Sequence, residues 1–173
     1  MMRRSQSKRV RGYSLIELVV VISILGILAV SASSHYLDLQ KDARSSVIVT
    51  TKASMRAINE QVHLMTNLGY VEMRIDTPGQ IGQARFLDLN RDGIQQKEQG
   101  EWGLIWLDLD NLDMPDALIL DPKLKVQFEE QTHLYVGFDR QASTIKDGNC
   151  WALYVQPRKE LDVAEYHVEA SGC

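Results

Sequence analysis

Apolar residues dominate the first part of the chain, and their pattern changes about thirty residues in. Residues 13–32 read YSLIELVVVISILGILAVSA and hold a single charged side chain, Glu17. Twenty helical residues rise about 30 Å, the thickness of the hydrocarbon core of a bilayer. Apolar side chains occupy every face of this helix, whereas an amphipathic surface helix has only one apolar face. The pattern therefore predicts a membrane-spanning helix over residues 13–32.

Beyond residue 32 the apolar positions are spaced for a helix that buries one face. They recur at multiples of three and four, with charged residues between them, at Leu39, Ala43, Val47, Ile58, Val62 and Met65. Neither proline nor glycine interrupts residues 31–67, and Gly69 supplies a stop signal. We therefore predict one long helix over residues 13–68.

After Gly69 the pattern becomes that of short strands separated by turns. Most segments alternate apolar and polar residues, as half-buried antiparallel strands do. The predicted strands cover residues 84–89, 103–109, 125–129, 134–138, 151–156 and 164–169. The expected fold class is α+β, with the long N-terminal helix packed on an antiparallel β-sheet head formed by residues 69–173.

Charge is distributed unevenly along the chain. Five of the 19 basic residues and no acidic residue lie in residues 1–12, so the remainder has 14 basic against 23 acidic residues. A basic cluster before an apolar helix keeps the N-terminus cytoplasmic and exports the residues beyond the helix. The acidic remainder argues against nonspecific nucleic-acid binding, which requires cations that neutralise phosphates.

Three interpretations of the apolar segment compete. Its basic start and a Val30-Ser31-Ala32 triplet fit a signal peptide, although the apolar run is long for one. A plain membrane anchor is the second. The third gives Glu17 a function, because a carboxylate inside a membrane costs on the order of 2–3 kcal/mol and is usually paired. Alternatively, Glu17 lies at the level of the lipid headgroups, is hydrated there and has no function. Cleavage after Gly12 would place a free amine on Tyr13, four residues away.

The string from Gly12 to Glu17 and the apolar residues 18–30 resemble the type IV pilins and the related pseudopilins. The resemblance implies that a prepilin peptidase removes the leader 1–12 and that Tyr13 is N-methylated. It also implies that Glu17 pairs with the N-terminal amine of a neighbouring subunit during assembly. The implied function is a structural pilus subunit that polymerises through its N-terminal helix.

Residues 37–44 and the ending 170–173 look closest to the mannose-sensitive haemagglutinin (MSHA) pilins. This likeness implies an adhesive surface filament, with other pilin subunits, the prepilin peptidase and the inner-membrane assembly machinery as partners. The subunit would cross the inner membrane once, with a periplasmic head, before it enters the extracellular filament. A minor pilin or a type II secretion pseudopilin is the alternative, followed by a membrane-tethered ligand-binding domain that never polymerises.

Cys150 and Cys173 are the two cysteines, and both lie on the exported side. Two thiols in an oxidising compartment are expected to pair, and two free buried thiols are the alternative. The closed loop of about 24 residues would contribute roughly 3 kcal/mol. A disulfide-closed C-terminal loop also recurs in type IV pilins.

A turn-forming stretch carries oxygen ligands at every second position, on Asp88, Asn90 and Asp92, with Gly93 at the sixth. This spacing resembles that of a calcium-binding loop of the EF-hand type, and calcium is the one candidate cofactor. Gln99 stands where such a loop has glutamate. A polar turn without metal is the competing interpretation, because Asp, Asn and Gly favour turns.

The sequence contains no pattern that predicts an enzyme. Its four histidines, at positions 35, 63, 133 and 167, show no metal-ligand spacing, and it has no glycine-rich phosphate loop. Trp102, Trp106 and Trp151 would suit a sugar site, but aromatic residues on strands more often belong to a core. A structural role is expected.

Overall fold

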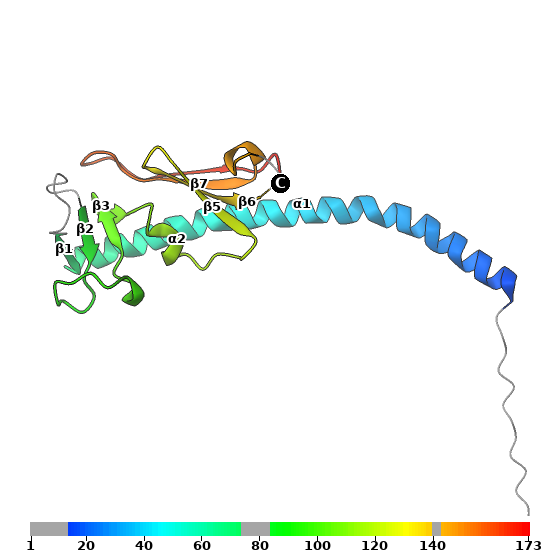
Figure 1. Cartoon of the computed structure of the whole chain (residues 1–173), viewed down its shortest axis with the longest axis horizontal. Helices are drawn as coiled ribbons and strands as arrows, with labels where there is room; N and C mark the ends of the chain where they lie inside the picture. Colours follow the sequence, from blue (N-terminus) through cyan, green and yellow to red (C-terminus); the bar gives the residue numbers. More distant parts are fainter. Residues whose placement is uncertain (1–13, 74–83, 140–142) are drawn as a thin grey trace, which may run out of the picture. The chain divides into compact units, whose positions relative to one another are not determined.

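The computed structural model describes residues 14–73, 84–139 and 143–173. The cleavage-site residues Gly12 and Tyr13 lie outside the described residues. The chain divides after residue 40 into two compact units, residues 1–40 and residues 41–173. Helix α1, Leu15–Asn67, continues from the first unit into the second (Figure 1).

Helix α1 confirms the predicted long helix, and its end has the expected chemistry. Gly69 has a φ of +81°, a left-handed conformation that costs glycine little. The amide of Tyr70 donates to the carbonyl of Met65 across 3.1 Å, which satisfies one of the last carbonyls of the helix. Among the described residues, α1 is the one helix long and apolar enough to cross a membrane.

The first sheet of the second unit contains β1 (Val71–Met73), β2 (Ala84–Leu87), β3 (Gly103–Ile105) and β4 (Asp108–Leu109), antiparallel in that order. The prediction of one strand over residues 103–109 is wrong. Trp106 and Leu107 both have positive φ and form a two-residue turn between β3 and β4. Such turns usually contain Asn and Gly, so these side chains gave no turn signal.

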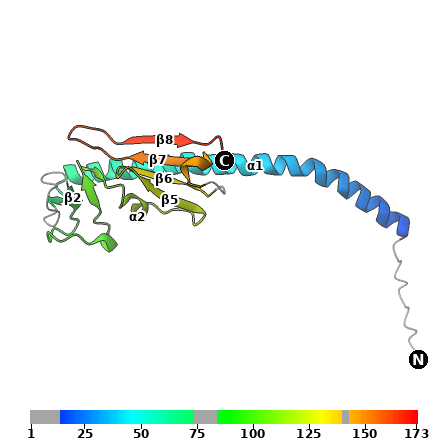
Figure 2. The same ribbon diagram turned by 45° about the horizontal axis from the view of Figure 1, so that its top comes forward.

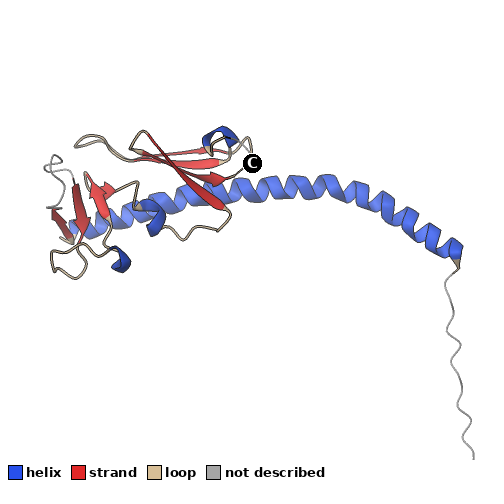
Figure 3. Ribbon diagram, in the orientation of Figure 1, coloured by secondary structure: helices blue, strands red, loops and turns tan. Residues whose placement is uncertain are grey.

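The second sheet contains β5 (Leu124–Glu129), β6 (His133–Phe138), β7 (Trp151–Val155) and β8 (Glu165–Glu169), again antiparallel in that order. Each matches a predicted strand to within one residue at either end. Figure 2 shows β7 and β8 alongside one another, and Figure 3 shows the two groups of strands. In the described connections between strands, the structure has three short helices, η1 (Lys97–Gln99), α2 (Met114–Ala117) and η2 (Lys146–Gly148).

One hydrophobic core joins the C-terminal half of α1 to both sheets. The helix contributes Ile48, Met55 and Val62, spaced by seven residues so that they share one face. Core side chains from the two sheets include Leu87, Leu104, Leu109, Leu134, Val136, Ala152 and Tyr154. The α+β prediction is therefore confirmed, although the described residues of the head form two sheets rather than one.

Cys150 and Cys173 form the predicted disulfide, with Cα atoms 4.8 Å apart. Both residues are buried in the core. The guanidinium of Arg44 on α1 donates to the backbone oxygen of Cys173 across 3.3 Å, and the amide of Gly172 donates to the carbonyl of Asn149 across 2.8 Å. The end of the chain is therefore held against α1 and the start of β7.

Candidate functional site: the apolar helix and the acidic end of the head

The first half of α1 exposes apolar side chains on all sides. The helix begins at Leu15, and the large apolar side chains between Leu15 and Val30 are all about half exposed or more. A soluble helix would bury one face, and this segment buries none of its most apolar window. An environment that the chain itself does not supply, such as lipid or neighbouring helices, must cover these side chains.

Glu17 lies in the first turn of α1 and forms a capping hydrogen bond. Its Oε2 accepts the backbone N–H of Ser14 across 2.8 Å. Ser14 and Glu17 have the spacing of a capping box, in which an acid at the third helical position reaches back to the N-cap amide. The sequence interpretation missed this role, although the Ser-x-x-Glu spacing indicates it.

The Glu17 carboxylate keeps capacity for further partners. An ionised carboxylate has about four acceptor positions, and among the described contacts one is used. The side chain is exposed, and the helix dipole at this end favours its charge. The arrangement can therefore accept a second donor, such as an amine, without breaking the helix.

The loop from Asp88 to Gly93 is built on carboxylates that accept backbone amides. Asp88 is buried, and its two oxygens accept the N–H groups of Asp92 at 3.1 Å and Gly93 at 2.9 Å. Asn90 accepts the Asp92 amide at 3.0 Å, and Asp92 accepts the Ile94 amide at 2.7 Å. The predicted ligand residues therefore lie together in one turn.

Glu101 closes this loop from the inside; in the sequence it is an acid close to the twelfth position of the loop, with no assigned role. It is 0% exposed, and its carboxylate accepts the amides of Leu89 at 3.0 Å and Gln96 at 2.8 Å. Within the described ranges no three His, Cys, Asp or Glu side chains are grouped to hold a metal. Asx turns and amide-accepting carboxylates explain the loop geometry. Calcium binding, which can also use amide and carbonyl oxygens, stays a prediction.

A second acidic cluster joins α1 to the β3–β4 turn. Asp108 is 4% exposed, and its Oδ1 accepts the side-chain amide of Asn59 and lies 3.1 Å from Nε2 of His63. The side-chain oxygen of Asn59 accepts the Leu109 amide across 2.8 Å. Burial raises the pKa of the neighbouring Tyr166 phenol to about 12. This polar contact fixes the hairpin on the helix.

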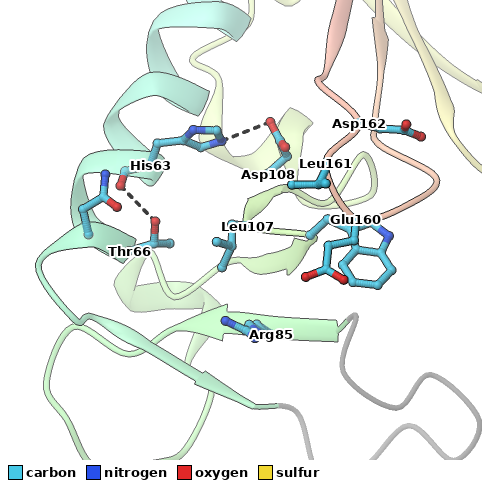
Figure 4. Close-up of a pocket in the computed structure, with 10 residues that line it drawn as sticks. His63, Thr66, Arg85, Leu107, Asp108, Glu160, Leu161 and Asp162 are labelled. Atoms are coloured by element: carbon cyan, nitrogen blue, oxygen red, sulfur yellow. Dashed lines mark hydrogen bonds and ion pairs between the residues drawn. The ribbon is translucent and has the colours of Figure 1, made fainter.

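The same hairpin borders a cleft of about 530 Å³ at the C-terminal end of α1 (Figure 4). Trp106 lines this cleft, whereas Trp102 packs partly buried against the core and Trp151 donates its indole N–H to Lys146 O across 3.0 Å. The three tryptophans therefore form no common site. The cleft itself joins segments about a hundred residues apart in the sequence, which no local pattern predicts.

The remaining histidines have separate surroundings. His133 lies beside Thr132 and Glu130, and His167 lies 3.0 Å from Glu165. His63 contacts Asp108 in the cleft. Each of these three histidines therefore has its own neighbours, and they do not form one site.

Comparisons with known proteins bear on the N-terminal segment and on most of the chain. Residues 7–33 match the family described as "Prokaryotic N-terminal methylation motif". The chain is 30% identical over 127 residues to a protein of Thermus thermophilus named "Pilin-like protein PilA1", and the match covers 65% of this chain and 77% of that relative. No solved structure is significantly similar.

Proposed function

The chain belongs to the type IV pilin-like protein family, and on this premise we propose that it is a structural subunit that polymerises through α1 into a surface filament. Proteins of this family are structural, which agrees with the prediction that the chain is not an enzyme. The apolar first half of α1 anchors the subunit in the membrane. A prepilin peptidase is proposed to cut after Gly12 before assembly.

One observation carries the proposal, namely an accessible carboxylate at the start of a helix that is otherwise apolar on every side. In a membrane this charge costs on the order of 2–3 kcal/mol, so it persists only with a compensating role. Cleavage after Gly12 would give each subunit a positive N-terminal amine on Tyr13. We infer that Glu17 of one subunit pairs with the amine of the next in the filament core.

The capping hydrogen bond is a competing reason for an acid at this position. A glutamine can also cap, since capping boxes use either Glu or Gln at the third helical position. It has no charge, however, and cannot form an ion pair with an amine. A glutamine substitution therefore separates the two roles of Glu17, and valine removes both.

The test compares three full-length chains in cells that assemble filaments, the wild type, Glu17→Gln and Glu17→Val. We expect abundant sheared filaments from the wild type and almost none from either variant. The subunit in wild-type filaments should have an intact mass that matches residues 13–173 plus one methyl group. Membrane-bound subunit, measured by immunoblot, should be similar in all three, which shows that the variants insert.

Two outcomes would oppose the proposal. A normal filament yield from Glu17→Gln would show that Glu17 acts only as a helix cap. A mature chain that retains residues 1–12, or that begins after residue 32, would identify a plain anchor or a signal peptide instead.

The finer proposal is a major subunit of an adhesive pilus of the MSHA kind, supported by residues 37–44 and 170–173. A minor pilin or a type II secretion pseudopilin is the alternative, and the acidic Asp88 loop favours it slightly. Abundance separates them, because a major subunit dominates the mass spectrum of sheared filaments. Loss of surface attachment on deletion of the chain would support the adhesive role.

A further inference from the structure

The cleft at the C-terminal end of α1 collects more negative than positive charge. His63 from α1 and Arg85 from β2 line it, together with Asp108 from the β3–β4 hairpin and Glu160 and Asp162 from the loop between β7 and β8. Figure 4 shows these side chains around the opening. Asp108 is buried and already bonded to Asn59 and His63, so the charges that an incoming group meets are the carboxylates of Glu160 and Asp162 and the guanidinium of Arg85.

Two further features strengthen this negative character. The last turn of α1 contains no basic residue, so the partial negative charge of the helix C-terminus is not compensated there. Glu160 has no ion-pair partner among the described residues, and Asp162 accepts only the backbone amide of Lys159, across 3.1 Å. The cleft is therefore suited to a cationic side chain that comes from outside.

Two exposed lysines lie at the other end of the same unit. Lys125 is on β5 and Lys123 closely precedes it, and neither forms an ion pair within the described part of the chain. Strand β5 is an outer strand of its sheet. Residue 124 pairs with Phe138, whose ring lies 6.0 Å from the guanidinium of Arg44 on α1.

The lysines and the cleft are too far apart to meet within one subunit. Arg44 and His63 are 19 residues apart on α1, which corresponds to about 28 Å. Exposed apolar side chains accompany both surfaces. Leu161 lines the cleft and is 94% exposed, and Ile119, which precedes β5 on the lysine side, is 105% exposed. Each surface therefore combines charge with an uncovered apolar residue.

We propose that these two surfaces bind each other between neighbouring copies of the chain, with Lys123 and Lys125 of one copy entering the acidic cleft of the next. The two surfaces differ, so the contact is head-to-tail, and contacts of this kind that do not close into a ring generate helical filaments. The inference rests on the proposed function, because the filament brings the copies together. It adds a contact between heads to the contacts of the apolar helices.

Cysteine cross-linking tests this contact directly in the full-length chain. The native cysteines are already paired with each other, so Lys125→Cys and Glu160→Cys introduce the only free thiols among the described residues. Mild oxidation of filaments from the double variant should give a ladder of disulfide-linked oligomers on a non-reducing gel. Filaments from either single variant should give no ladder.

Exchanging the charges of the lysine surface and the acidic cleft tests whether their contact contributes to assembly. Lys123→Glu with Lys125→Glu should lower the filament yield roughly tenfold or more, because like charges then face each other across the contact. Adding Glu160→Lys and Asp162→Lys in the same chain should restore assembly. Lys146→Glu is the matched control, since Lys146 is an exposed lysine whose ion pair is with Glu129 of its own chain.

The outcomes distinguish this contact from the proposed function. Wild-type filaments that depend on Glu17, without a cysteine ladder and without an effect of the charge exchange, would overturn the head-to-tail contact alone. A wild-type chain that forms no filaments would overturn both proposals. A loss of filaments that the exchanged charges do not restore, together with no ladder, would also reject the contact.

Discussion

Breaking the disulfide between Cys150 and Cys173 should lower the stability of the head by an amount that the loop length sets. The two residues are 23 positions apart, and the cross-link restricts the unfolded chain more strongly as that loop grows. Loop-closure entropy for a ring of about 24 residues gives about 3.4 kcal/mol at 25 °C. The melting temperature should fall by about 10 °C for a unit of this size.

Hydrogen bonds also hold the end of the chain. The amide of Gly172 donates to Asn149 O and Arg44 donates to the backbone oxygen of Cys173, and we expect both hydrogen bonds to persist after reduction. We therefore expect unchanged secondary structure below the melting temperature. The loss of stability should come from the unfolded chain, which gains freedom when the cross-link is absent.

The assay is urea unfolding of the detergent-solubilised full-length chain, followed by circular dichroism with and without a reductant. The double variant Cys150→Ala and Cys173→Ala is the control, because a reductant should not change its unfolding midpoint. A reductant-induced loss below about 1 kcal/mol in the wild type would refute the loop-closure reasoning. A comparable reductant-induced loss of stability in the double variant would also refute this reasoning.

Two further predictions concern the acidic end of the head. Asn59→Ala should lower the free energy of unfolding by about 2–4 kcal/mol, measured in the same urea assay, because the buried Asp108 carboxylate then keeps only its contact with His63 and the Leu109 amide loses its acceptor. Arg56→Ala, on the exposed side of the helix, is its matched control and should change stability by less than about 1 kcal/mol. Calcium should raise the melting temperature and a chelator should lower it, and Asp92→Ala should abolish both responses. Equal melting curves with calcium and with chelator would refute calcium binding by the Asp88 loop.

The parts of the fold that the sequence predicted are those with a strong local pattern. Helix α1 followed from an unbroken apolar run, a one-sided apolar stripe and Gly69, and the strands of the second sheet followed from alternation. Strand β1 has only three residues, too few for a pattern. Helix α2 was missed although Asp113 and Pro115 are typical of a helix start.

Among the candidate sites, too, those with a local sequence pattern could be predicted and those built from distant segments could not. Glu17 was recognisable because a charge inside an apolar run is conspicuous, and Asp88, Asn90 and Asp92 because their spacing is local. The acidic cleft was not, since its walls come from α1, β2, the β3–β4 hairpin and the loop after β7. Trp106 and Leu107 adopt left-handed conformations, which their side chains do not favour, so local turn chemistry gave no sign of the turn.

The hydrogen bond from the Ser14 amide to Glu17 lowers the cost of holding this carboxylate in a bilayer before assembly. The carboxylate already has a provisional donor inside its own chain, so a stored subunit does not hold a bare charge in lipid. If Glu17 pairs with an amine in the filament as proposed, assembly would replace or supplement this donor and would not supply the first partner of an unpaired charge. The free energy gained from the proposed pairing would then be smaller than that for a carboxylate without any donor, and the pairing would be correspondingly easier to reverse.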